Sequence, residues 1–358
     1  MSTTDAEREL LRETVGQLLA EHCTPERVAA AAGSEAGWDA ATWQVLQETG
    51  LTLVGSPEER GGSGGDLSEA ADIAVAAGAA AAPVPLAETL AAGMVLARAG
   101  LDIPAGPLTL AGAVSLAGAG RGGGRVLTRV PYGRVATVVA VGAGADGREW
   151  LAVVPPEQLP PGQPRAGRNL AGEPRDDIEL GPDAPVREVA AGTAEYAGRL
   201  RRLFRSLLIA GAAQRALELT ITYVTEREQF GRPLGKMPVV QAELARMAGE
   251  VAVISAATQA AAADLAGGKP GGAGISPVLA AKAQASAGAG TVAAIAHQLH
   301  GAIGTTSEHR LRLTTTRLWA WREEDGTAAE CFAALGREAV AAAGGPAGPG
   351  LWPWLSRS

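Results

Sequence analysis

The chain has 358 residues, of which 47% are hydrophobic and 19% are charged, and its formal net charge is −7. This composition is typical of a soluble globular protein with a large core, and the negative charge argues against general affinity for nucleic acid or an anionic membrane. No stretch reaches the roughly 20 apolar residues of a membrane-spanning helix, and the polar, acidic N-terminus predicts no secretory signal, so we expect a cytoplasmic protein.

Cysteine and histidine usage predicts neither a disulfide framework nor a metal site. The two cysteines, Cys23 and Cys331, lie far apart in the sequence. His297 and His300 stand three residues apart, but the further ligands that a zinc site needs are missing from the pattern.

The first hundred residues are predicted to be helical. Apolar residues at helical spacing indicate helices over 5–23, 39–49, 66–79 and 86–99. Asp66 and Glu69 have the spacing of a capping box, and Gly50 is placed to end the second helix. We therefore expect an all-helical domain over residues 1–102.

The pattern then changes to short β-branched runs among glycines and prolines. Residues 135–141 and 150–154 are predicted strands, joined by a GAGADG turn. We expect a small β domain over residues 103–186, and the overall fold class is mainly α with a small β domain.

The remaining chain is predicted to form an antiparallel helical bundle over residues 187–343, followed by a tail at 344–358. One apolar seam runs from Leu200 through Ile221 to Val224, and a second runs from Val240 to Ile254. Three further helices are expected over 277–301, 307–321 and 327–343, the first with Ser276 as its cap and the last with a capping box of Thr327 and Glu330.

Three stretches resemble the acyl-CoA dehydrogenase family: WQVLQETGLTLVGSPEERGGSGGDLSE, AQRALELTITYVTEREQFGRPLG and HQLHGAIGTTSEH. The most specific elements are an R-x-x-F-G motif and a Q-x-x-G-x-x-G motif, which contain Arg227, Phe230, Gly231, Gln298, Gly301 and Gly304. The resemblance implies an N-terminal helical domain, a middle β-barrel-like domain and a C-terminal four-helix bundle. It covers the β unit poorly.

The family's chemistry implies a cofactor and roles for these residues. Its members remove the α-hydrogen of an acyl-CoA as a proton and pass the β-hydrogen as hydride to FAD, and an electron-transfer flavoprotein takes the electrons. By resemblance, Arg227 meets the FAD pyrophosphate and Phe230 packs on the cofactor. Gln298, Gly301 and Gly304 meet the adenosine end of FAD held by the neighbouring subunit. Thr327 is also expected to contact the cofactor.

Three of these residues also have a purely structural interpretation. Arg227 is equally explained as a cation near a helix C-terminus. Gly301 and Gly304 are equally explained as a helix stop and as close-packing positions.

The sequence departs from the family at three places. The β unit lacks the family's T-E-P-x-x-G-S-D-like loop. The family's commonest base is a Glu before a Gly-Thr pair, and Asp325 stands there, one methylene shorter. A second base position used by some members is occupied by Arg201.

The acids at 323–325 are alternatively a solvated helix start. The arginines from 199 to 205 are alternatively a solvated helix face or a contact for a CoA phosphate.

These departures favour one subunit of a heteromeric FAD-dependent acyl-CoA dehydrogenase, whose paralogous partner supplies the base and the flavin loops. One alternative is a self-sufficient homomeric enzyme, a dimer or tetramer, with Asp325 as the base. The other alternative is a non-catalytic scaffold with the same fold. The expected partners are an acyl-CoA substrate, the second subunit and an electron-transfer flavoprotein.

Overall fold

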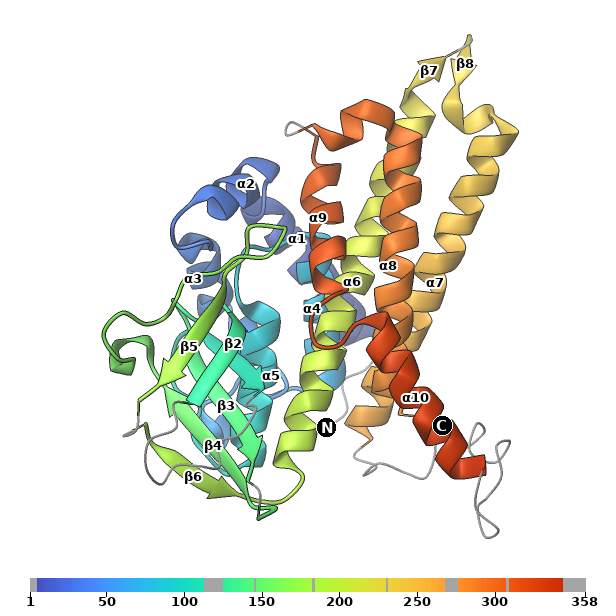
Figure 1. Ribbon diagram of the computed structural model, residues 1–358. Coiled ribbons are helices and arrows are strands. Elements are labelled where there is room, and N and C mark those ends of the chain that lie inside the picture. Colours follow the sequence, from blue (N-terminus) through green and yellow to red (C-terminus); the bar gives the residue numbers. More distant parts are fainter. Residues whose placement is uncertain are drawn as a thin grey trace. The chain divides into compact units, whose positions relative to one another are not determined.

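The computed structural model describes residues 5–112, 125–144, 146–181, 184–229, 231–267, 276–306 and 309–343. The chain forms two compact units, whose elements are labelled in Figure 1. Residues 1–73 and 82–204 make the first unit, and residues 74–81 and 205–358 make the second. The division into three domains made from the sequence stays a prediction.

The four helices predicted for the N-terminal region are confirmed, and one more is present. The helices are α1 (Asp5–His22), α2 (Pro25–Gly33), α3 (Ala40–Glu48), α4 (Leu67–Ala79) and α5 (Leu86–Arg98), with 3₁₀ turns η1 (Leu51–Leu53) and η2 (Glu58–Arg60). The unpredicted helix α2 begins after Thr24, whose Oγ1 accepts a hydrogen bond from Arg27 N at 3.4 Å. This cap stabilises a helix too short and too rich in alanine to show a clear apolar period.

Two small sheets in the first unit share one core. The strands are β1 (Leu108–Gly112), β2 (Arg125–Pro131), β3 (Thr137–Ala143), β4 (Glu149–Val154), β5 (Arg175–Leu180) and β6 (Val186–Val189), and a turn η3 (Pro156–Gln158) follows β4. One sheet has the order β1-β3-β4-β6, with β1 parallel to β3, and the other pairs β2 with β5. The predicted strands are β3 and β4, which pair antiparallel. Alternate residues of both sheets, including Leu127, Val138, Ala152 and Ile178, pack together.

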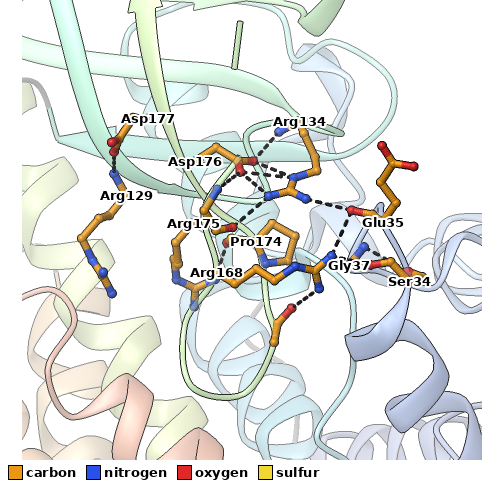
Figure 2. Close-up of polar contacts among 12 residues, drawn as sticks. Ser34, Glu35, Gly37, Arg129, Arg134, Arg168, Pro174, Arg175, Asp176 and Asp177 are labelled. Atoms are coloured by element: carbon orange, nitrogen blue, oxygen red, sulfur yellow. Dashed lines mark hydrogen bonds and ion pairs between the residues drawn. The ribbon is translucent and has the colours of Figure 1, made fainter. Parts of the chain in front are cut away.

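A polar network joins the loop before β5 to the end of α2 (Figure 2). Arg134 N donates to Asp176 Oδ2 at 2.9 Å, and Arg134 Nη1 donates to Glu35 O at 2.8 Å. Arg168 donates to Ala32 O at 2.7 Å and to Glu35 O at 3.1 Å. The two guanidinium groups therefore satisfy carbonyls at and just beyond the last turn of α2. We interpret the network as a structural contact within the first unit.

The second unit is helical, as predicted. It contains α6 (Thr193–Glu226) from residue 205 onward, α7 (Pro238–Ala266), α8 (Pro277–His300), α9 (Leu311–Trp321) and α10 (Ala328–Ala343), with short elements β7 (Glu228–Gln229), β8 (Arg232–Pro233), η4 (Leu234–Lys236) and η5 (Gly301–Thr305). Helices α6 to α9 lie side by side (Figure 1). The predicted cap at Ser276 is confirmed, because its Oγ accepts from Leu279 N at 3.4 Å.

The buried face of α6 differs from the predicted seam near its end. Leu207 and Val224 are each 1% exposed, but Ile221 is 47% exposed, so its assignment to the core was wrong. Ala216 and Thr220 are buried in its place. Small side chains let neighbouring helices approach closely, and a pattern read from large apolar residues does not detect such a face.

Two glycines allow α4 and α6 to cross with their backbones in contact. A Cβ atom placed on Gly211 would lie 1.9 Å from Val75 O. A Cβ atom placed on Gly78 would lie 2.2 Å from Leu208 O. Both separations are far below van der Waals contact, so any larger residue would force the helices apart.

Candidate functional site

Arg227 and Gly231 of the R-x-x-F-G motif belong to an exposed hairpin at the end of α6. Arg227 N donates to Tyr223 O at 2.8 Å, so the helical hydrogen bonds continue one residue beyond the end of α6. Arg227 O accepts a hydrogen bond from Leu234 N at 2.9 Å. Strands β7 and β8 form the hairpin, whose turn includes Gly231 at φ 75°. The Arg227 side chain is exposed. Phe230, the predicted packing residue, lies outside the described residues.

The Q-x-x-G-x-x-G motif covers the end of α8 and the turn η5. Gln298 is exposed on the last turn of the helix. Gly301 caps the helix at φ 65°, and a Cβ atom there would meet nothing within 4 Å. Gly304 is buried, and a Cβ atom there would lie 2.8 Å from His300 Cβ. The two glycines therefore have local structural reasons, as a helix stop and a close-packing position. Their cofactor roles stay a prediction.

The structure brings these two motifs to the same end of the second unit (Figure 1). The rings of Tyr223, in the last turn of α6, and His300, in the last turn of α8, stack with centroids 4.4 Å apart. Asp325 belongs to a different region, because Lys282 Nζ near the start of α8 donates to Arg322 O at 3.4 Å. Gln298 lies roughly 24 Å further along the same helix, at about 1.5 Å per residue.

Asp325, the predicted base, is held in a buried ion pair. Arg205 Nε lies 3.1 Å from Asp325 Oδ2, and Arg205 Nη2 lies 3.3 Å from Glu324 Oε2. The three side chains are 5%, 7% and 8% exposed for Arg205, Asp325 and Glu324. The backbone of Asp325 is left-handed, with φ 58°, and Gly326 follows at φ 111°. The acids at 323–325 and the arginines from 199 to 205 were alternatively interpreted as solvated. This interpretation is wrong for Glu324, Asp325 and Arg205, whose side chains are buried.

A buried lysine completes this charged cluster. Lys282 is fully buried in α8, and its Nζ donates to Ser286 Oγ as well as to Arg322 O. Burial lowers the pKa of Lys282 to about 8, while the nearby Asp325 carboxylate and Cys331 thiol oppose that change. Two cations and two carboxylates thus meet beneath the turn between α9 and α10, and their charges balance.

The titration of Lys282 should be visible as a pH-dependent stability. Its pKa is about 8 in the folded chain and 10.5 as a model value, so the unfolded chain binds more protons between these pH values. The free energy of unfolding should therefore rise with pH in this window, by about 1 kcal/mol per pH unit at most. Urea denaturation at about pH 7.5 and about pH 9.5 measures the change. Lys282→Met should lack this rise, and equal slopes for both proteins would contradict the assignment.

Comparison with known proteins identifies the family. Residues 5–102 match the model of the acyl-CoA dehydrogenase N-terminal domain, and residues 189–338 match that of the C-terminal domain. Acyl-CoA dehydrogenase IpdE2 of Mycobacterium tuberculosis is 34% identical over 324 residues, which span 87% of this chain and 90% of the relative. This chain belongs to the acyl-CoA dehydrogenase family. IpdE2 of Mycolicibacterium smegmatis is 31% identical and spans 86% and 90% of the two chains.

Solved structures confirm the acyl-CoA dehydrogenase fold. A chain of the ChsE4-ChsE5 complex from Mycobacterium tuberculosis matches with a TM-score of 0.82 and 27% identity, covering 94% of this chain and 98% of that one. A variant of the Tcur3481-Tcur3483 steroid ACAD matches with a TM-score of 0.82 and 26% identity over the same shares. Acyl-CoA dehydrogenases are oxidoreductases that bind FAD.

Thr327, the remaining predicted cofactor contact, forms the capping box expected from the sequence. Thr327 N donates to Glu330 Oε2 at 2.9 Å, and Glu330 N donates to Thr327 Oγ1 at 3.2 Å. The hydroxyl also donates to the same carboxylate at 3.1 Å. These bonds explain the start of α10. A cofactor contact of Thr327 remains a prediction.

Sequence reasoning missed the structural importance of Arg205, Lys282 and the Tyr223–His300 stack. A signal existed for Lys282, because it is the only charged residue in the alanine-rich stretch from Pro277 to Ala296. Within the described ranges, no helix combines the length and the apolar character needed to cross a bilayer. In those same ranges, no three His, Cys, Asp or Glu side chains gather as metal ligands would.

Proposed function

We propose that this chain is one subunit of a heteromeric FAD-dependent acyl-CoA dehydrogenase, whose paralogous partner supplies the catalytic base and the flavin loops. The observation that carries the proposal is the ion pair of Asp325 with Arg205, at 3.1 Å between side chains less than one tenth exposed. The Asp325 carboxylate, at the family's base position, already forms an ion pair with the Arg205 guanidinium.

The reaction demands the opposite environment for a base. FAD, when bound, accepts the β-hydrogen of the acyl-CoA as hydride, while a carboxylate takes the α-hydrogen as a proton. A carboxylate accepts a proton readily when it lies in a dry pocket without a cation. Arg205 instead stabilises the charged form of Asp325, and protonation would leave the buried guanidinium with a weakened pair. These contacts favour a structural role for Asp325 in this chain.

The exposed residues at the other end of the second unit fit a cofactor held by another subunit. An arginine guanidinium binds the charged pyrophosphate of a dinucleotide well, and an amide can bond its adenosine part. Arg227 and Gln298 are both exposed, and Gly301 is open around its Cα. We assign Arg227 to the pyrophosphate and Gln298 with Gly301 to the adenosine end. Because Gln298 lies roughly 24 Å along α8 from Lys282 at the Asp325 turn, we assign it to a site other than one at Asp325.

The structural relatives also support a heteromer. One of them, ChsE4-ChsE5, is a complex of two differently named subunits, and its chain covers 94% of ours. By analogy we propose a paralogous acyl-CoA dehydrogenase subunit as the partner and an electron-transfer flavoprotein as the electron acceptor.

Flavin content tests the proposal. The chain purified alone should be colourless, and the complex co-expressed with a paralogous subunit should be yellow and should bleach with an acyl-CoA. Size and flavin stoichiometry of the complex complete the measurement. Yellow protein from this chain alone that bleaches with an acyl-CoA would favour the homomeric alternative with Asp325 as base. A complex that never binds flavin would favour the scaffold alternative.

Arg227→Ala should strip flavin from the complex. A hydrogen bond to a charged group contributes about 1.5 to 3 kcal/mol, so we expect flavin binding to weaken about tenfold to a hundredfold. Absorbance of the gel-filtered complex measures the retained flavin. Arg60→Ala is the control, because Arg60 is 41% exposed and pairs with Asp102 in the first unit. Wild-type flavin content in the Arg227 variant would refute our assignment of this residue.

A further inference from the structure

Three ring side chains form a cluster at the end of the second unit that carries the two motifs. Tyr223 of α6 stacks on His300 of α8 with centroids 4.4 Å apart and planes 20° apart. His309, before α9, meets the edge of both rings, at 5.0 Å from His300 and 6.4 Å from Tyr223. The cluster therefore connects the ends of α6 and α8 with the start of α9.

Tyr223 and His300 lie directly beside proposed flavin contacts. Tyr223 O accepts from Arg227 N at 2.8 Å, so the tyrosine lies one helical turn before the arginine. His300 lies between Gln298 and Gly301 in the chain, and its Cβ fills the space next to Gly304. A shift of either ring would move the hairpin or the η5 turn with it.

We propose that Tyr223, His300 and His309 are positioning residues, which hold the hairpin and the η5 turn in one fixed arrangement so that both reach the same flavin dinucleotide in the partner subunit. This inference rests on the proposed function. It adds that the two motifs act as one rigid element. Stacked aromatic pairs contribute stability beyond the area that they bury, so the Tyr223–His300 contact stabilises the approach of the two chain segments.

The contacts of His309 require a neutral imidazole, and burial disfavours a charge on His300. Leu311 N donates to His309 Nδ1 at 3.2 Å, which is possible only while that nitrogen carries no proton. His300 is 3% exposed, and its Nδ1 lies 2.8 Å from Ala296 O. Burial lowers the pKa of both histidines below 6.5. Protonation of His309 Nδ1 therefore breaks its hydrogen bond with Leu311 N, and protonation of His300 places a charge in a buried site.

The titratable and charged groups around the cluster come from three elements. Tyr223 faces it from α6 and His297 from α8, where His297 stacks on Trp319 with centroids 5.1 Å apart. Arg310 lies next to His309 and further lowers its pKa. Since the folded-state pKa values lie below 6.5, the arrangement is intact above pH 6.5 and is lost as the pH falls through the folded values.

The first test compares Tyr223→Ala with Tyr223→Phe in the co-expressed complex. Tyr223→Ala should release flavin about fivefold faster than wild type, because the stacked ring is gone. Tyr223→Phe keeps the ring and should retain the wild-type rate. The thermal midpoint of each variant reports on folding. Wild-type flavin release from an assembled Tyr223→Ala complex would overturn the inference, as would equal losses in both variants.

The second test is a pH profile, which a general loss of packing would not produce. The wild-type complex should release flavin faster at about pH 5.5 than at about pH 7.5. A double variant, His300→Phe with His309→Phe, keeps ring packing without titration, and its flavin release should depend less on pH than that of wild type. The same pH dependence in the double variant and in wild type would overturn the inference. If the co-expressed complex binds no flavin, the proposed function fails; if the complex binds flavin and Arg227→Ala loses it while Tyr223→Ala does not, only the positioning role fails.

Discussion

Replacing Arg205 by methionine is expected to lower the free energy of unfolding of the second unit by about 3 to 5 kcal/mol. The Arg205 side chain is 5% exposed and contacts Asp325 at 3.1 Å and Glu324 at 3.3 Å. Methionine fills a similar volume without charge, so two buried carboxylates would share Lys282 alone. Removing one partner of a buried pair is costly because the remaining charge is neither solvated nor fully paired. Urea denaturation followed by circular dichroism measures the loss.

An exposed pair on the same turn provides the control. Arg322 Nε lies 2.8 Å from Glu323 Oε1, and their side chains are 39% and 54% exposed. Arg322→Met should therefore cost less than about 1 kcal/mol. Neutralising the buried carboxylates together with the cation, as Arg205→Met with Glu324→Gln and Asp325→Asn, should recover part of the lost stability. Similar losses for the two single variants would show that the Arg205 pair contributes no more than a surface contact.

Replacing Gly211 by alanine is expected to destabilise the second unit by about 3 kcal/mol, at the upper end of the usual cost of overpacking. The added Cβ atom would lie 1.9 Å from Val75 O and 2.7 Å from Ala79 N. Both atoms belong to the backbone of the α4 segment, so no side-chain rotation can relieve the clash. Thermal and urea unfolding of the purified chain measure the effect.

Gly249→Ala is the matched control, because it makes the same change inside another long helix. Gly249 is exposed in α7, and a Cβ atom there would meet nothing within 4 Å. Alanine is about 1 kcal/mol more favourable than glycine in a helix interior, so this variant should be slightly more stable than wild type. If Gly211→Ala were also stabilising, the close crossing of α4 and α6 would not exist in solution.

Local signals predicted most helices of this protein correctly. The capping boxes at Asp66 and Thr327 form with both reciprocal bonds, because each needs only residues three positions apart. Helix α2 and strands β1, β2, β5 and β6 were not identified individually. Helix α2 is short and rich in alanine, and the four strands are fixed by pairing with other strands and not by their own pattern.

The candidate site was predictable only in part. The hairpin and the α8 turn were singled out because their motifs resemble those of the family, and the structure places both at one end of the second unit. Their roles toward FAD remain predictions. The environment of Asp325 was not predictable, because Arg205 is separated from it by 120 residues. A run of arginines has the same appearance in sequence whether it is solvated or buried.

The sequence by itself determined the mainly helical class, the helix ends and the family resemblance, since all three depend on short-range patterns and motif spacing. Only the tertiary structure decided which charges are buried together, which glycines allow backbones to touch, and which rings join the two motifs. These depend on the desolvation of groups far apart in the chain. Asp325 shows the difference: in the sequence it stands at the position of the family's base, and in the structure it forms a buried ion pair with Arg205.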